Sequence, residues 1–146
     1  MKIALGCDHA AYEMKEMVKH LLLSQDIEVE DCGTYSIERA DYPDYAMKVS
    51  KAVLDEGILG ILLCGSGIGV SIVANRFKGI RAALCRTECD AEMARKHNDA
   101  NVLCLGARVN TEEEIKKIIK AWLSHSFEGG RHADRLKIFE NLGASC

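Results

Sequence analysis

Residues 58–69, ILGILLCGSGIG, join an unbroken apolar run to a loop that has three glycines in five positions. An apolar run without alternation, as in 58–64, is typical of a central parallel strand that helices cover on both faces. Glycines after such a strand let the backbone approach a ligand closely, and their N–H groups can surround an anion. The run ends in Cys64, which is either a small buried residue at the end of a strand or a thiol held over that loop.

Elsewhere the chain alternates between strand and helix patterns. The expected strands cover 2–7, 27–33, 58–64, 80–85 and 101–106. The expected helices cover 11–25, 43–57, 87–98, 111–127 and 133–143, with Pro43 at a helix start and Thr87 and Thr111 as N-caps. This alternation predicts one α/β domain over residues 1–146, a three-layer doubly wound (Rossmann/flavodoxin-like) fold with a five-stranded parallel sheet and a C-terminal helix. The expected strand order is 2-1-3-4-5, with right-handed connections.

Composition and charge exclude several classes of protein. The 146 residues are 48% hydrophobic and 28% charged, the formal net charge is -3, and Lys and Arg are scattered, so nucleic acid is not an expected partner. No apolar stretch approaches the ~18 residues that span a bilayer, and no signal segment is expected at the N-terminus, so a membrane is not an expected partner either. A cytoplasmic location is therefore the expectation.

The seven cysteines are expected to be free rather than disulfide-bonded. Five of them end or lie within short apolar runs, as free cysteine does when it packs as a small hydrophobic residue. No C-x-x-C pair is present, and although Cys85 and Cys89 are close enough to share a metal ion, no second pair completes a site. The pattern indicates a reducing compartment and no metal.

Polar side chains gather where the first and third expected strands end. Asp8 and His9 follow the first strand, and Cys64 and Ser66 lie at the end of the third. In an open α/β sheet, ligands bind beyond the carboxyl ends of the strands at the switch point, which the expected order places between these two strands. N–H donors and a helix N-terminus favour a thiolate, so Cys64 can serve as a base or nucleophile. Cys7 has no glycine loop after it and is expected to be structural.

The glycine loop matches none of three familiar phosphate-binding motifs. A dinucleotide fingerprint that starts at Gly65 needs glycine at position 70, where this chain has Val70. A phosphatase-type C-x5-R loop needs arginine at that same position, and a P-loop needs a Gly-Lys-Ser/Thr triplet that the chain does not contain. The loop is therefore expected to hold an anion in another way.

Basic and amide side chains in three later segments each have a structural and a functional interpretation. His97 precedes the fifth strand, at the amino end of the sheet, where it either closes a helix at the surface or belongs to a site. Asn98 suits a turn. Arg108 follows the carboxyl end of the fifth strand. Arg131 and Arg135 are four residues apart, which suits either a phosphate-binding pair or a solvated helix face.

Six short motifs together resemble the B-type ribose-5-phosphate isomerases, in the sugar-phosphate isomerase family that also holds galactose-6-phosphate isomerase. In chain order, they are GCDHA (6–10), DYPDYA (41–46), LCGSGIG (63–69), KHNDANVL (96–103), GARV (106–109) and EGGRH (128–132). Each motif alone is weak evidence for the family, but the six occur in order from one end of the chain to the other.

The resemblance implies a role for each candidate residue. Cys64 is implied as the base, and His97 is implied to assist opening of the sugar ring, with Asp8 on the substrate's oxygens. The residues implied to hold the enediolate are Gly65, Ser66, Gly67, Ile68 and Gly69. The residues implied to bind phosphate and sugar hydroxyls are His9, Arg108, Arg131 and Arg135, with Asn98 and Tyr42 lining the pocket. The family's sites form between two subunits, so a homodimer or a dimer of dimers is expected, with His97 and the terminal arginines acting across the interface.

These residue types suit an aldose–ketose isomerase that interconverts ribose 5-phosphate and ribulose 5-phosphate. A single base moves a proton between C2 and C1 through a cis-enediolate while fixed donors hold the developing oxyanion, so no cofactor is expected. One alternative keeps this mechanism on a six-carbon sugar phosphate (allose 6-phosphate or galactose 6-phosphate) or a free aldose. Another alternative is a non-catalytic phosphate- or nucleotide-binding module, which needs the loop and the arginines but neither Cys64 nor His97.

Overall fold

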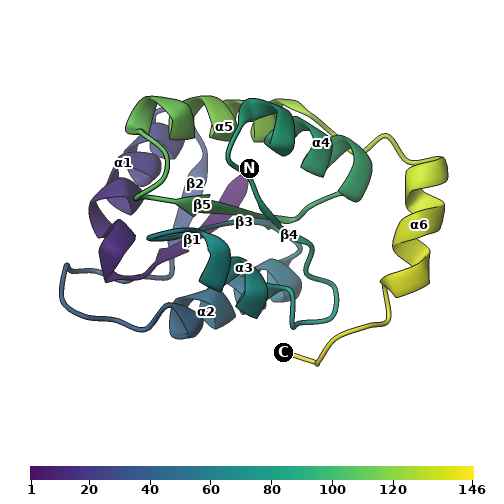
Figure 1. The fold of residues 1–146 in the computed structure, drawn as a ribbon, viewed down its shortest axis with the longest axis horizontal. Helices are drawn as coiled ribbons and strands as arrows, with labels where there is room; N and C mark the ends of the chain where they lie inside the picture. Colours follow the sequence, from purple (N-terminus) through teal and green to yellow (C-terminus); the bar gives the residue numbers. More distant parts are fainter.

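A five-stranded parallel sheet lies between two layers of helices in the computed structural model, which describes residues 1–146 (Figure 1). The strands are β1 (Lys2–Cys7), β2 (Glu28–Asp31), β3 (Leu59–Cys64), β4 (Ala82–Leu84) and β5 (Val102–Gly106). The helices are η1 (His9–Ala11), α1 (Tyr12–Leu23), α2 (Tyr42–Glu56), α3 (Ile68–Ala74), α4 (Glu88–Asn98), α5 (Glu112–Ser124) and α6 (Arg131–Phe139). None of these helices combines the length and the apolar character that crossing a membrane requires. The expected doubly wound α/β class is confirmed.

The strand order is β2-β1-β3-β5-β4, so the expected order 2-1-3-4-5 is wrong at its last two places. Every residue of β5 is buried, whereas the residues of β4 are only half-buried, so the apolar strand takes the inner place and the short strand takes the edge. The chain passes from β3 through α3 to that edge and returns through α4 to β5. Since β-α-β crossovers are right-handed, this change of direction puts α3 and α4 on opposite faces of the sheet.

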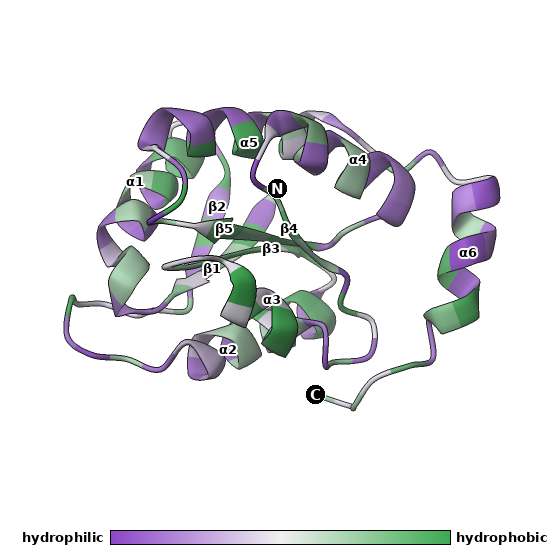
Figure 2. Ribbon diagram, viewed as in Figure 1, coloured by the Kyte–Doolittle hydropathy of each residue, from purple (hydrophilic) through white to green (hydrophobic).

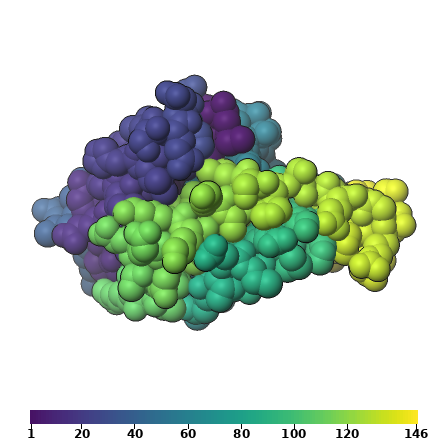
Figure 3. Space-filling model, turned by 90° about the horizontal axis from the view of Figure 1, so that it is seen from above, coloured from purple at the N-terminus to yellow at the C-terminus, as the bar shows by residue number.

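Two hydrophobic cores, one on each face of the sheet, hold the layers together. On one face α1, α4 and α5 pack around the fully buried Trp122, and Figure 3 shows α5 lying between α1 and α4. On the other face α2 and α3 pack against β1, β3 and β5. Figure 2 shows the apolar inner strands and the polar outer surfaces of the helices. Burial of each large apolar side chain stabilises the fold by about 1.5–3 kcal/mol, so these cores fix the sheet that carries the site.

The helix ends follow local capping chemistry. Thr87 and Thr111 each accept a backbone N–H three residues further on, and the acid at that position completes a capping box in both cases, so both expected N-caps are confirmed. α5 ends at Ser124, three residues before its expected end, because His125 has an extended backbone. α6 begins at Arg131, two residues before its expected start.

A side chain covers part of the outer edge of β4. The Asn75 amide donates to the carbonyl oxygen of Ala82 over 2.8 Å, and the Asn75 side-chain oxygen accepts the Ala82 N–H over 2.9 Å. Both backbone groups of this edge residue are therefore satisfied without a further strand.

Candidate active site

The glycine loop after β3 directs a backbone donor at the sulfur of Cys64. Cys64 is buried at the end of β3, and the N–H of Gly67 donates to its Sγ over 3.1 Å. The Ser66 hydroxyl oxygen accepts the N–H of Ile68 over 3.2 Å, at the start of α3. Gly67 has a φ of 77°, and a Cβ at this position would lie 2.6 Å from Cδ1 of Leu84. Only glycine therefore allows the turn that aims this N–H at the thiol.

The other buried cysteines have surroundings that disfavour a thiolate. Burial raises the pKa of Cys7 and of Cys85 to about 12, and it raises the pKa of Cys104 well above its usual value. Burial also raises the pKa of Cys32 to about 11, and the thiols of Cys32 and Cys85 donate to backbone carbonyls 3.7 Å away. All seven cysteines are free, as expected. The sulfur of Cys64 accepts a backbone hydrogen bond from the glycine loop.

Asp8 and His9 stand beside this loop at the end of β1. β1 pairs with β3 in a register that sets Cys7 beside Leu63, and the N–H of Asp8 donates to the carbonyl oxygen of Leu63 over 3.3 Å. The Asp8 carboxylate caps η1 by accepting the N–H of Ala10 over 3.0 Å. His9 Nδ1 lies 3.0 Å from the carbonyl oxygen of Ala40, which ties the ring to the loop before α2.

Arg108 and Tyr42 flank the two ends of the glycine loop. The backbone N–H of Arg108, after β5, donates to the carbonyl oxygen of Gly65 over 2.9 Å. The Arg108 side chain crosses above Gly65, where a Cβ would lie 3.5 Å from Nη1. The Tyr42 ring lies against Gly69, where a Cβ would be 2.8 Å from the ring carbons. The structure thus brings both residues to the loop that carries Cys64.

The remaining expected site residues lie at the opposite end of the sheet. His97 and Asn98 end α4, which returns the chain to the amino end of β5, and the Asn98 carbonyl oxygen accepts from Arg81, just before β4. Arg131 and Arg135 are exposed on α6, which projects beyond that end of the sheet (Figure 1). Within one chain, these four residues do not meet the loop that follows β3.

Two residues without an expected role surround His97. The His97 and His132 rings stack with their centroids 4.2 Å apart. Oε2 of Glu128 lies 4.0 Å from Nε2 of His97 and 3.9 Å from Nε2 of His132. Burial, followed by the charges of His97 and the α6 arginines, lowers the pKa of His132. Glu128 and His132 both belong to the motif EGGRH (128–132), so the sequence did single out this segment. It did not show that these two residues contact His97.

The same three side chains are a candidate metal-binding group by donor type alone. Their ligand atoms all lie within 4.8 Å of one another. A metal ion lies close to the plane of each imidazole that binds it, but the two ring planes here are stacked at only 12° to each other. Two nearly parallel planes share no nearby point, so this arrangement suits hydrogen bonding and proton exchange better than one ion.

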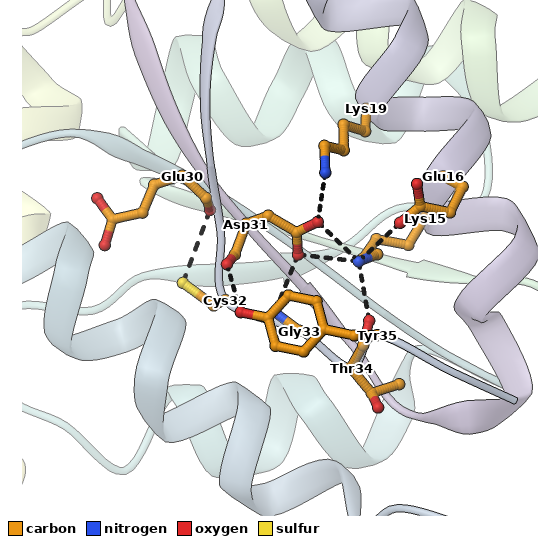
Figure 4. A network of polar contacts seen from close by, with 9 residues as sticks. All are labelled: Lys15, Glu16, Lys19, Glu30, Asp31, Cys32, Gly33, Thr34 and Tyr35. Atoms are coloured by element: carbon orange, nitrogen blue, oxygen red, sulfur yellow. Dashed lines mark hydrogen bonds and ion pairs between the residues drawn. The ribbon is translucent and has the colours of Figure 1, made fainter. Parts of the chain in front are cut away.

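A buried lysine, Lys15, holds the segment that follows β2 (Figure 4). The Lys15 ammonium is fully buried, and it binds both oxygens of Asp31, at 2.8 and 2.9 Å, and the carbonyl oxygen of Thr34, at 2.8 Å. Burial works against its charge, but hydrogen bonds to Asp31 and Glu16 raise the pKa of Lys15. The segment it holds is in turn bonded to the end of β1, where the Thr34 N–H donates to the Cys7 carbonyl oxygen over 2.9 Å.

A cavity of about 680 Å³ lies away from the cysteine loop. It opens between α6 and the edge of the sheet at β4, and its apolar walls include Phe77, Phe127 and Phe139. Asn98 lines it, whereas Cys64 and its neighbours do not.

The fold and these residues define a doubly wound α/β protein with a cysteine–glycine loop at the switch point between β1 and β3. The chain belongs to the ribose/galactose isomerase family, whose model matches residues 3–139. Ribose-5-phosphate isomerase B of Escherichia coli is 47% identical over 137 residues, which is 93% of this chain and 92% of that protein.

Solved structures give the same result. The crystal structure of a ribose 5-phosphate isomerase from Thermotoga maritima matches with a TM-score of 0.94 and 51% identity, over 97% of this chain and 98% of that chain. Ribose-5-phosphate isomerase B from Mycoplasma genitalium, solved with bound ribulose-5-phosphate, matches with a TM-score of 0.91 and 39% identity, over 95% of this chain and 93% of that chain.

Proposed function

We propose that the protein interconverts ribose 5-phosphate and ribulose 5-phosphate, with Cys64 as the base. The observation that carries this proposal is the hydrogen bond from the Gly67 N–H to the Cys64 sulfur, because it holds that sulfur, with backbone donors beside it, at the mouth of the ligand crevice. Cys64 removes the C2 proton of the open-chain aldose as the C1=C2 bond forms and the electron pair of the C1 carbonyl moves to the C1 oxygen. The proton of the O2 hydroxyl then passes to the C1 oxygen, and the thiol returns its proton to C1 as the C2 carbonyl forms. Fixed donors of the loop and the Ser66 hydroxyl stabilise the cis-enediolate between these steps.

The names of the relatives support this substrate. The Escherichia coli relative is a ribose-5-phosphate isomerase B, and the Mycoplasma genitalium neighbour holds ribulose-5-phosphate. The reaction needs a base and preorganised donors, which this chain supplies itself. We further propose that residues 1–146 act as one catalytic domain. The free cysteines suit a cytoplasmic, reducing location.

We also propose that two copies of the chain assemble each site. One copy contributes Cys64 and the loop Gly65–Gly69, with Asp8, His9, Tyr42 and Arg108 beside them. The other copy contributes His97 for ring opening, Asn98 to line the pocket, and Arg131 and Arg135 for the phosphate. The support for this arrangement is that the two groups lie at opposite ends of the sheet in one chain, and each is incomplete without the other.

Initial rates on three sugars test the function and its alternatives. Ketose formation is followed with ribose 5-phosphate, allose 6-phosphate and free allose at equal concentrations. We expect the highest kcat/KM with ribose 5-phosphate and the lowest with the free sugar, because the arginines need a phosphate to bind. Faster turnover of allose 6-phosphate would assign the site to six-carbon substrates, and no turnover of any sugar would favour a non-catalytic binding module.

A further inference from the structure

The turn between α4 and β5, directly after His97 and Asn98, is held by an arginine from another part of the chain. Arg81, which precedes β4, donates its Nε–H to the carbonyl oxygens of Asn98, at 3.1 Å, and Asp99, at 2.9 Å. These carbonyls end a helix and have no partner within it, so a cation that binds them fixes the last turn. The Arg81 backbone N–H is itself held by the Asn101 side chain over 2.7 Å.

Asp99 bridges two arginines from a backbone conformation that most residues avoid. Its φ is 43°, and it ends α4 in the left-handed region where glycine is the usual choice. Its carboxylate forms ion pairs with Nη2 of Arg81, at 3.0 Å, and with Nη1 of Arg95, at 3.1 Å. Arg95 also donates to the carbonyl oxygen of Ala100 over 2.6 Å. A glycine would fit this turn with less strain, so the side chain is needed for the bridge and not for the backbone.

We propose that Arg81 and Asp99 are positioning residues for His97 and Asn98. The inference rests on the function proposed above, in which His97 assists ring opening. His132 and Glu128 confine the His97 ring, and the Glu128 N–H donates to the Lys96 carbonyl oxygen over 3.0 Å, but they do not fix the turn that follows Asn98. The Arg81–Asp99 bridge does so, because it ties the end of α4 to the start of β4.

Ring opening is needed in only one direction of the reaction. In the furanose of ribose 5-phosphate, the C1 hydroxyl gives up its proton as the C1–O4 bond breaks, O4 gains a proton, and an aldehyde forms. Ribulose 5-phosphate cannot form a furanose, because the oxygen that would close the ring on C2 carries the phosphate. A defect confined to His97 therefore slows turnover of ribose 5-phosphate more than turnover of ribulose 5-phosphate, whose aldose product can leave in the open form and close in solution.

Values of kcat at saturating substrate, measured in both directions, test the proposal, because the equilibrium constant fixes the ratio of the two kcat/KM values but not that of the two kcat values. In Asp99→Gly, the left-handed turn stays accessible while both ion pairs are lost. We expect kcat with ribose 5-phosphate to fall by about 10- to 100-fold, since a small displacement of a catalytic group has effects of this size, and kcat with ribulose 5-phosphate to fall by less than about threefold. Asp26→Gly is the matched control, because Asp26 is the other non-glycine residue with positive φ, at 58°, and it lies in the turn after α1. This control should leave both rates unchanged.

Arg81→Lys provides a second variant that keeps the charge but loses the paired donors, and it is expected to show the same asymmetry. The positioning role would be overturned if kcat fell equally with the two sugars. It would also be overturned if neither variant lowered kcat with either sugar. Failure of the wild-type protein to interconvert the two sugars would instead reject the proposed function, and the two failures are therefore distinct.

Discussion

The Gly67 N–H donates a hydrogen bond to the Cys64 sulfur over 3.1 Å, so the sulfur occupies a fixed position at the crevice with a donor already in place. If this sulfur is the base, its removal leaves no other group to move the proton. We expect Cys64→Ala to lower kcat by at least about 10²-fold, the lower end for a lost acid–base group, while titration calorimetry still detects sugar-phosphate binding.

Cys7→Ala is the matched control, since Cys7 ends the neighbouring strand and its pKa is raised to about 12 by burial. This variant should keep a kcat close to that of the wild-type protein. Comparable losses in both variants would mean that the carboxyl end of the sheet, rather than the Cys64 thiol, had been damaged.

The position of that donor depends on Gly67. A Cβ here would lie 2.6 Å from Leu84 and 2.8 Å from the backbone of Leu105, and the φ is 77°. We expect Gly67→Ala to lower the free energy of unfolding by about 1–3 kcal/mol and to remove most of the activity, because the loop must shift away from the thiol. Gly57→Ala is the control that separates backbone strain from side-chain clash. Gly57 also has a positive φ, of 65°, but a Cβ at this position would meet no atom within 4 Å. It should cost about 1–2 kcal/mol in urea unfolding and leave kcat intact.

The location of Cys64 and His97 at opposite ends of the sheet leads to a complementation test. We expect Cys64→Ala and His97→Asn each to turn over ribose 5-phosphate poorly alone. When the two variants are unfolded together and refolded as a mixture, half of the dimers are mixed, and each mixed dimer has one site with both wild-type groups. About a quarter of the wild-type activity per chain should return. A mixture no more active than its parts would show that each site is built from one chain.

The ion pairs of Asp31 make stability depend on acid pH. Burial tends to raise the pKa of the Asp31 carboxyl, but hydrogen bonds from Lys15 and Lys19 outweigh it and lower this pKa below 3.8. Because the folded pKa is the lower one, the pairing stabilises the fold above pH 3.8, and this contribution is lost as the pH falls through the folded value. We expect Asp31→Asn to lower the free energy of unfolding at pH 7 by about 3 kcal/mol, because the buried Lys15 loses its main partner.

Urea unfolding between pH 2.5 and 7, a range chosen to cover the titration of Asp31, measures this effect. The wild-type protein should lose more stability than Asp31→Asn between pH 4 and 2.5. Asp55→Asn breaks the exposed pair with Lys51 and should change stability by less than about 0.5 kcal/mol. Parallel pH profiles for the wild-type protein and Asp31→Asn would contradict the assignment.

Local patterns were enough to locate the inner strands but not to order the sheet. The apolar runs predicted β1, β3 and β5 to within one residue, because burial on both faces leaves a strong compositional signal. The places of β4 and β5 depend on which of two short strands buries more surface among its neighbours. The surface that each strand buries depends on tertiary packing. The unbroken apolar character of β5 nevertheless favoured an inner position in the sheet.

The residues at the strand ends could be grouped from sequence, and those around His97 could not. Asp8 and Cys64 follow neighbouring strands, so parallel topology alone brings them together. His132 meets His97 only because α6 folds back on the end of α4. Lys15 lies in a helix pattern where a lysine indicates a solvent-facing position, and its partner Asp31 is sixteen residues away. Such contacts depend on how distant segments pack together, which the spacing of residues along the chain does not show.

The covering of Ala82 by the Asn75 side chain has a consequence for self-association. A bare outer strand is a template on which another molecule can add its own strand, and repetition of that step leads to ribbons and aggregates. Here the Asn75 side chain occupies both backbone groups of Ala82, and β2 at the opposite edge carries Glu28, Glu30 and Asp31. Addition of a strand is thereby disfavoured at both edges of the sheet.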